Sequence, residues 1–368
     1  MTDTSPNTGP NTGPLRIGFA GGNATRGWAR DAHLPAIRAL PGLAVGAVSA
    51  RDQSLADEAA AVFGAPVAYG DTLAMVRDPG IDIVAVTVKV PEHRAIVLAA
   101  IAAGKHVYCE WPLGRDLAEA EELAAAARAS DVHVAIGLQG THAPAIRHAA
   151  RLVREGAIGR PLNLRVVSPT AGWANEAPPF YAYLQDKRNG ATLSSIAGGH
   201  TIAVIEAIVG PYADLSAINS ILRDTVRISG TDEVVQRTCP DHVLAIGRHA
   251  NGCVSSLEVL GGLPNTPFLF ELRGTEGALT VSGHHAGGFQ VSDLTVTATP
   301  AAAPQSAHVV AGLAGGPINV AESWAAFEAD IRAGTRTVPD FETAVRLTRV
   351  LDAIDTAADT GGRVTIAD

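Results

Sequence analysis

The sequence predicts a two-part protein: an α/β part with a doubly wound parallel sheet, followed by an α+β domain with a large, mostly antiparallel sheet. Short apolar runs alternate with helical stretches from about residue 15 to residue 140, which favours the parallel sheet. Glycines follow the first apolar run directly. After residue 141, apolar runs follow one another with Gly, Pro and Asn between them, which favours antiparallel strands.

The first part reads as a regular alternation of strands and helices. We expect strands at 15–20, 43–49, 81–88, 106–109 and 132–137, with helices at 27–40, 55–63, 93–103 and 117–129. Helices then cover both faces of a parallel sheet. Ligands of such sheets bind at the C-terminal ends of the strands, so the candidate site lies at that edge.

The second part reads as a helix, a series of strands and two closing helices. We expect helices at 144–155, 320–333 and 343–358, and strands at 162–168, 215–221, 242–248, 253–260, 268–274 and 278–282. One sheet face should stay open, with Val243, Leu257 and Leu269 among its apolar residues. An exposed apolar face normally finds a partner, which predicts a homodimer or a higher symmetric oligomer.

Composition limits the classes of protein that the chain can represent. The net charge of −9 disfavours nucleic acid and anionic membranes as partners. Three cysteines without close spacing suggest a reducing, cytoplasmic compartment and no metal site, and His284-His285 lacks ligands at metal spacing. Residues 1–14 repeat NTGP and are too polar to fold. We therefore expect a disordered tail at 1–14, a first domain at 15–140 and a second at 141–368.

The turn after the first strand has the composition of a phosphate-binding loop. It contains Gly18, Gly21, Gly22, Asn23 and Ala24. Glycines let a backbone approach a pyrophosphate, and the following helix N-terminus favours its charge. Asn23 takes the place of a customary glycine, and asparagine tolerates a positive φ. Together with the alternating elements, the turn predicts a Rossmann-type domain that binds a dinucleotide.

The end of the second strand selects between cofactors. An acidic residue there would bind the adenosine ribose and favour NAD. The chain has Ser49 and Arg51 instead, and a guanidinium suits the 2′-phosphate of NADP. We expect NADP(H) to be preferred over NAD(H). The alternative is that Arg51 is a solvated residue paired with Asp52.

Several motifs together resemble one family of oxidoreductases. They are HLPAI at 33–37, His93, Glu110-Trp111-Pro112, GGH at 198–200, RGTEG at 273–277 and the segment 324–340. This order resembles the glucose–fructose oxidoreductase/inositol dehydrogenase (Gfo/Idh/MocA) family. The resemblance implies a nicotinamide cofactor near His93, Glu110 and Trp111, and a second domain that covers the nicotinamide and forms oligomers.

The chain departs from this family's pattern at two catalytic positions. The family carries lysine where this chain has Trp111, and aspartate where it has Ile196. GGNATRGWARDAHLPAI at 21–37, LQG at 138–140, GHTI at 199–202 and PDH at 240–242 resemble a divergent branch, the galactose-regulon corepressors of yeasts. That resemblance implies dinucleotide binding, with or without catalysis.

Two residues lead as proton donors. His200 matches the family's histidine, although a histidine on an apolar helix is often a core residue. Lys89 ends the strand at 81–88, where a shielded lysine can transfer a proton. The alternative for Lys89 is that it contacts a cofactor phosphate or points to water.

Aromatic residues supply candidates for the substrate wall. Trp111 either stacks on a ring of the substrate or cofactor, or wedges the two domains apart. The loop at 172–190 carries Trp173, Tyr181 and Tyr183 and forms either a substrate lid or a subunit contact. Either tyrosine is a further candidate acid.

These observations predict an NADP-dependent oxidoreductase. It would interconvert a hydroxyl (or amine) and a carbonyl (or imine) on a small cyclic substrate, sugar-like or aromatic. Two alternatives stay open: a non-catalytic, dinucleotide-sensing regulator, and a lyase or glycosidase that uses the nicotinamide transiently.

Overall fold

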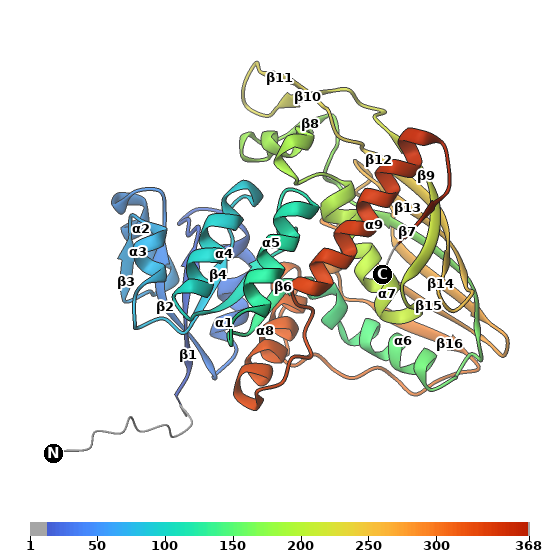
Figure 1. The fold of residues 1–368 in the computed structure, drawn as a ribbon, viewed down its shortest axis with the longest axis horizontal. Helices are drawn as coiled ribbons and strands as arrows, with labels where there is room; N and C mark the ends of the chain where they lie inside the picture. Colours follow the sequence, from blue (N-terminus) through green and yellow to red (C-terminus); the bar gives the residue numbers. More distant parts are fainter. Residues whose placement is uncertain (1–12, 367–368) are drawn as a thin grey trace.

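The computed structural model describes residues 13–366, which form two large sheets joined by packed helices and a small third sheet of three strands (Figure 1). Residues 1–12 of the expected tail lie outside the described residues. The first sheet carries helices on both faces, and the second is a broad sheet covered by helices on one side. No helix in the range 13–366 is long and apolar enough to cross a membrane.

The first sheet has six parallel strands in the order β3-β2-β1-β4-β5-β6, which confirms the doubly wound prediction. In chain order its elements are β1 (Leu15–Ala20), a π-helix (Ala29–His33) continuing into α1 (Leu34–Arg38), β2 (Leu43–Ser49), α2 (Gln53–Phe63), β3 (Val67–Tyr69), α3 (Thr72–Val76), β4 (Ile83–Val86), a 3₁₀ helix (Val90–Glu92), α4 (His93–Ala102), β5 (His106–Glu110), α5 (Leu117–Arg128) and β6 (Val134–Gly137). β3 and α3 were not predicted, because neither is long enough to show a period.

The second sheet has eight strands in the order β16-β15-β14-β7-β13-β12-β9-β17. All its strand pairs are antiparallel except β13 with β7, which confirms a mostly antiparallel sheet. Its part of the chain contains a 3₁₀ helix (Gln139–His142), α6 (Pro144–Arg154), β7 (Pro161–Pro169), β8 (Glu176–Ala177), two 3₁₀ helices (Pro179–Gln185 and Lys187–Asn189), a π-helix (Ser194–Gly198) continuing into α7 (Gly199–Val209), β9 (Tyr212–Ser220), β10 (Thr225–Ile228), β11 (Val234–Gln236), β12 (His242–His249), β13 (Val254–Leu260), β14 (Phe268–Gly274), β15 (Ala278–Gly283), a 3₁₀ helix (Phe289–Val291), β16 (Thr295–Thr299), α8 (Gly316–Ala333), α9 (Phe341–Thr360) and β17 (Val364–Thr365).

The open face of this sheet carries different residues from those expected. Val243 and Leu257 are 1% and 2% exposed and belong to the core, and Leu269 is partly buried. The exposed apolar side chains are Ile218, Leu244 and Ile246. Successive residues of a strand point to opposite faces, so the expectation for Val243 and Leu257 was wrong by one residue of register.

Helix α8 packs back onto the first sheet. Its Val320, Trp324 and Phe327 are fully buried in one core cluster with residues of β1 and β5. Helix α9 contacts both α5 and β9, so it bridges the two sheets. The domain boundary at residue 140 stays a prediction, and residues far beyond it complete the core around the first sheet.

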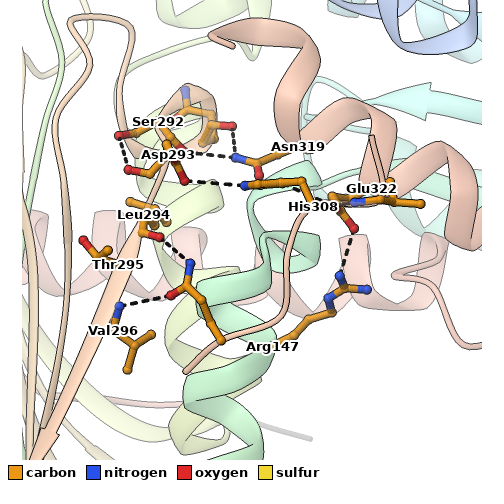
Figure 2. Close-up of polar contacts among 12 residues, drawn as sticks. Arg147, Ser292, Asp293, Leu294, Thr295, Val296, His308, Asn319 and Glu322 are labelled. Atoms are coloured by element: carbon orange, nitrogen blue, oxygen red, sulfur yellow. Dashed lines mark hydrogen bonds and ion pairs between the residues drawn. The ribbon is translucent and has the colours of Figure 1, made fainter. Parts of the chain in front are cut away.

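A buried carboxylate on α8 holds the segment that precedes this helix. Figure 2 shows Glu322, which accepts hydrogen bonds from Arg147 Nη2 at 2.8 Å and from the Val309 backbone at 2.6 Å. His308 lies between Glu322, at 3.2 Å, and Asp293, at 3.5 Å. The segment between β16 and α8 is thereby fixed against α6 and the edge of the second sheet.

Candidate functional site

The turn after β1 is shaped by two glycines. Gly21 has a φ of +97°, which a side chain would strain. A Cβ on Gly22 would lie 2.0 Å from Val48 Cγ2. The backbone N–H groups of both residues donate to Ser49 O, so the turn folds over the end of β2. Gly18 lies inside β1, where it leaves room for Met75 and Ile81.

Asn23 builds the rest of the turn through its side chain. Its Oδ1 accepts hydrogen bonds from the backbone of Thr25 at 2.9 Å and of Arg26 at 3.1 Å. Its own φ is not positive, contrary to the expectation that it replaces a glycine in that conformation. Within residues 13–366, the N–H groups of Asn23 and Ala24 have no acceptor. Two free N–H groups beside a glycine turn fit a pyrophosphate.

The two residues expected at the adenosine ribose differ in their surroundings. Ser49 is fully buried, and its hydroxyl lies 2.9 Å from Thr72 Oγ1 and 3.3 Å from Phe19 O. It therefore holds the strand ends together. The Arg51 side chain is 84% exposed, with Nε 3.6 Å from Asp52. Asp52 also caps α2, so Arg51 is left extended at the strand edge.

Glu110 is the last residue of β5, and a histidine side chain contacts its carboxylate. His33 Nε2 lies 2.9 Å from Glu110 Oε1. On its other side, His33 Nδ1 accepts a hydrogen bond of 2.9 Å from the Trp324 indole. A Cβ on Gly137, at the end of β6, would lie 2.6 Å from Glu110 Oε1. The carboxylate therefore lies between the ends of β5 and β6.

His93 is a bracing residue in this structure. It is 1% exposed, with its ring nitrogens 3.0 Å from Pro112 O and 3.1 Å from Val88 O. Burial lowers the pKa of His93 and favours its neutral form. The ring bridges the loops that follow β4 and β5. It therefore fixes the edge of the sheet at which we expect a cofactor to bind.

Trp111 occupies the seam between the first sheet and α7. Its indole N–H donates to Ser195 O at 2.6 Å, and the ring is 5% exposed. A Cβ on Gly199 would lie 2.4 Å from the indole. These contacts favour the wedge interpretation over stacking on a ligand ring.

His200 follows Gly199 at the start of α7. Burial lowers the pKa of His200 to about 4, so the ring is neutral near pH 7. Its Nδ1 is buried and has no hydrogen-bond partner among the described residues. A buried ring nitrogen without a partner can form a hydrogen bond with a ligand.

Lys89 and the aromatic loop meet at the end of β4. Lys89 is exposed, and its Nζ lies 4.6 Å from the ring centroid of Tyr183. In the same 3₁₀ helix, Pro179–Gln185, the Phe180 ring lies 5.1 Å from the Arg26 guanidinium. The loop thus contacts cations that follow β1 and β4, on either side of the crevice between them.

A cavity of about 460 Å³ lies behind this loop. Its lining includes Trp173, Tyr181, Tyr183, Gln290 and Ile196. Burial raises the pKa of Tyr183 to about 12, and burial followed by the charge of Asp31 raises the pKa of Tyr181. Ile196 gives the cavity an apolar wall at the position where the family has aspartate.

Neither Asp241, in the PDH motif at 240–242, nor any of the three cysteines lines this cavity. Asp241 is buried, and Arg237 Nη1 donates to it at 2.9 Å, which is a structural ion pair. No cluster of three or more His, Cys, Asp or Glu side chains within 13–366 is arranged to hold a metal. Cys109, Cys239 and Cys253 are free and buried.

Sequence reasoning did not assign site roles to His33, Trp324, Arg26 or Phe180. The first two belong to motifs that carried the family resemblance, which was the available signal. Arg26 also lies in such a motif, at 21–37, and Phe180 lies in the loop at 172–190. Their contact could not be predicted, because it joins segments more than 150 residues apart in the chain.

Comparisons with known proteins agree with this architecture. Residues 15–138 match the model of the oxidoreductase family with an NAD-binding Rossmann fold, and residues 144–283 match the C-terminal domain of Gal80p. The galactose/lactose metabolism regulatory protein GAL80 of Kluyveromyces lactis is 29% identical over 311 residues, which span 77% of this chain and 66% of that protein.

Enzymes are also among the similar proteins. Dehydrogenase aclE of Aspergillus oryzae is 32% identical over 249 residues, covering 64% of this chain and 67% of that protein. A levoglucosan dehydrogenase solved in complex with NADH and levoglucosan superposes with a TM-score of 0.82, at 23% identity, covering 96% of this chain and 100% of that one. With a matching Rossmann model, a Gal80p-like second part and these relatives, the chain belongs to the Gfo/Idh/MocA oxidoreductase family, on the branch that resembles Gal80.

Proposed function

We propose that this protein is an NADP-dependent oxidoreductase acting on a small cyclic substrate, sugar-like or aromatic. It interconverts a hydroxyl (or amine) and a carbonyl (or imine). One observation carries the proposal: Tyr183, which lines the cavity of about 460 Å³, holds its ring 4.6 Å from Lys89 Nζ at the end of β4, the strand edge where dinucleotides bind in this fold. The names of the levoglucosan dehydrogenases to which the chain is similar support a sugar-like substrate.

The cofactor edge has the groups that a dinucleotide needs. The free N–H groups of Asn23 and Ala24 suit the pyrophosphate, and the extended Arg51 suits a 2′-phosphate. A bound nicotinamide would supply the hydride chemistry. The protein's own residues then bind, orient and move the proton.

Lys89 is our first candidate for the proton donor. It follows β4, and its Nζ lies against the ring of Tyr183, which lines the cavity. His200 is neutral near pH 7, so it suits hydrogen bonding or proton acceptance better than donation. Tyr183 keeps its proton to high pH and is the second candidate donor. Ile196 has no acidic proton, and the indole N–H of Trp111 is bound to Ser195 O and is not an acid near neutral pH.

The test is consumption of NADPH with a panel of cyclic carbonyl compounds, followed by absorbance. The panel contains ketoses, lactones and cyclic aromatic ketones, and the reverse reaction uses the corresponding alcohols with NADP. Steady consumption with one class identifies the substrate. If NADPH binds but no member of the panel supports turnover in either direction, the oxidoreductase proposal fails.

The second candidate function is a dinucleotide-sensing regulator without turnover. The favouring observation is Trp111, which fills the position of the family's lysine and is locked against Gly199. The similarity to GAL80 supports it too. Binding of NADP(H) that alters association with another protein, without consumption, would support it. Turnover with tightly bound, unconsumed cofactor would instead indicate a lyase or glycosidase.

We further propose that the protein is a homodimer or a higher symmetric oligomer. The open face of the second sheet exposes Ile218, Leu244 and Ile246, with Leu244 paired opposite Ile218. Such an apolar face is an association surface. Light scattering should show more than one copy at micromolar concentration, and Ile246→Ser should raise the dissociation constant about tenfold. A monomer in the native protein would contradict this.

A further inference from the structure

We infer that the side-chain N–H₂ of Gln185 donates a hydrogen bond to an oxygen of the substrate, and that the cavity of about 460 Å³ takes an uncharged ring compound. This rests on the proposed function, whose substrate class it narrows. Gln185 is the residue that contacts the ligand. Arg237 and Asp241 are positioning residues, which act through Gln185.

The amide of Gln185 has one orientation, which its buried neighbour sets. Arg237 Nε lies 2.9 Å from Gln185 Oε1. A guanidinium carries only N–H donors and has no acceptor, so the atom that faces it must be the amide oxygen. The N–H₂ group of Gln185 therefore points away from Arg237.

Arg237 is itself fixed by all three of its nitrogens. The side chain is fully buried, as is that of Asp241. Besides the Nε contact, Nη1 donates to Asp241 Oδ2 at 2.9 Å, and Nη2 donates to the backbone oxygen of Ala174. Asp241 also accepts hydrogen bonds from the Leu222 backbone at 2.8 Å and from Arg223 Nη1 at 3.2 Å. The guanidinium cannot rotate without breaking several of these bonds, so the amide that it holds is fixed too.

The N–H₂ group of Gln185 has spare hydrogen-bonding capacity. Gln185 is 3% exposed, and it lines the cavity together with Tyr181. Within residues 13–366 the one acceptor of Gln185 Nε2 is Tyr181 O, at 3.4 Å. An amide nitrogen has two protons, and a contact of that length is a weak hydrogen bond. A nearly buried donor without a good acceptor favours a ligand oxygen that completes its bonds.

The charges around the cavity decide which oxygens fit. None of the described residues that line it is a lysine, arginine or histidine, and Lys89 Nζ lies over the ring of Tyr183 without lining the cavity. Hydrogen bonds from Arg227 and Ser229 lower the pKa of the lining residue Glu176, which is therefore ionised near neutral pH. Arg227 balances that charge. A carboxylate or phosphate ligand would lose its water without gaining a cation, whereas an uncharged hydroxyl or carbonyl oxygen fits.

The rest of the lining supplies apolar surface for a ring. Trp173 has a φ of +58°, which few residues other than glycine adopt, and its indole N–H donates to Leu184 O at 3.3 Å. Strained backbone of this kind persists only where the surroundings fix it, so this wall is rigid. Ile196 adds aliphatic surface. A compact carbon ring with uncharged oxygens matches such a cavity in size and polarity.

The first experiment measures the orientation of the amide in the native full-length chain. Nitrogen-15 labelling of glutamine side chains gives one N–H₂ signal pair for each glutamine, and the pair that disappears in Gln185→Glu is assigned to Gln185. Arg237→Lys keeps a cation for Asp241 but loses the planar fork, so the Gln185 pair should shift or broaden. An unchanged pair in a folded Arg237→Lys variant would overturn the positioning role.

The second experiment measures the binding of ring compounds by ligand-observed NMR, with NADPH present. The uncharged probes are D-glucose, D-xylose and cyclohexanol, which a reduced cofactor does not convert. D-glucuronate and a phosphorylated glucose are the matched charged probes. At least one uncharged probe should bind, and its charged counterparts should bind at least about tenfold more weakly. Binding of a charged probe as tightly as D-glucose, or of no uncharged probe, would overturn the substrate class.

Substitutions of Gln185 then test the contact itself. Gln185→Glu keeps an oxygen for Arg237 and replaces the donor by an acceptor, so the affinity for the bound probe should fall about tenfold or more. Gln185→Met removes the donor without adding a charge and should also lose affinity. Gln236→Glu, at an exposed glutamine of β11 outside the cavity, is the matched control. Native-like affinity in a folded Gln185→Met variant would overturn the contact.

Turnover separates this inference from the oxidoreductase proposal. If an uncharged probe binds through Gln185 while no member of the carbonyl and alcohol panel supports turnover, the oxidoreductase proposal fails and the binding role of Gln185 stands. If the native protein turns over a substrate and Gln185→Glu and Gln185→Met do so with unchanged kcat and KM, the binding role fails and the oxidoreductase proposal stands.

Discussion

The two halves of the cofactor edge are built by different means. At the ends of β1 and β2, the candidate ligand groups are backbone N–H groups and one extended arginine, Arg51. At the end of β5, Trp111 and the His33 ring that contacts Glu110 are fixed by residues from the second part of the chain. Phosphate recognition should therefore change with one substitution at the surface. The ends of β4 and β5, which we call the reactive half of the site, should instead keep their geometry only while the two parts of the chain stay packed together.

The sharpest test of the reactive half is Lys89→Met, which removes the cation and keeps the chain length. If Lys89 donates the proton, turnover at saturating NADPH should fall about a hundredfold to ten-thousandfold. Lys187→Met, an exposed lysine away from the 460 Å³ cavity, is the control. A rise in the cofactor KM with unchanged kcat would mean that Lys89 contacts phosphate only.

His200 should make stability in the reactive half depend on pH. Its pKa falls from 6.5 to about 4 because burial disfavours the charged ring. Between these values the unfolded chain binds a proton that the folded chain does not, so stability is present above pH 6.5 and is lost as the pH falls toward 4. The full span is worth about 3 kcal/mol.

Urea unfolding from pH 7 to pH 4 measures this loss. The His200→Gln variant should show a shallower decline, whereas His285→Gln, at an exposed histidine, should leave it unchanged. Other groups with lowered pKa values, among them His106 and His142 at about 4, should contribute to the decline that is left. An identical pH profile in His200→Gln would refute the assignment.

Arg51→Asp tests the phosphate half. Losing one guanidinium–phosphate contact is worth about 1.5–3 kcal/mol, so the preference for NADP(H) should erode roughly tenfold to a hundredfold. NADH affinity should hold or improve, and Arg154→Asp, an exposed arginine on α6, is the control. Equal affinity of the native protein for both cofactors, by calorimetry, would show that Arg51 is solvated.

The sequence was more informative for the ends of β1 and β2 than for the ends of β4 and β5. The strand ends at Ala20 and Ser49 were predicted to the residue, because apolar runs bounded by glycines or polar residues are local signals. The Glu110–His33–Trp324 contacts could not be predicted, because they join three segments and depend on the return of α8 to the first sheet. The prediction that Val243 lies on the open face was wrong for a related reason. An alternating strand has two faces, and the alternation does not say which face the helices cover.

Gly199→Ala tests the contact between Trp111 and helix α7. The new methyl would lie 2.4 Å from the Trp111 indole, so the ring or α7 must shift, at about 1–3 kcal/mol of unfolding free energy. Gly198→Ala is a control one residue away: its φ is −63° and its nearest neighbours are 3.7 Å off, so it should be neutral or stabilising by up to about 1 kcal/mol.

A second substitution separates the steric cause from a general effect on α7. In Trp111→Leu the smaller side chain vacates the space that the methyl of Gly199→Ala needs, so the double variant should lose less stability than the sum of the single variants. Denaturant unfolding of all four proteins gives this coupling energy. Additive losses would show that Trp111 and Gly199 do not share the seam, and the interpretation of Trp111 as a wedge would then fail.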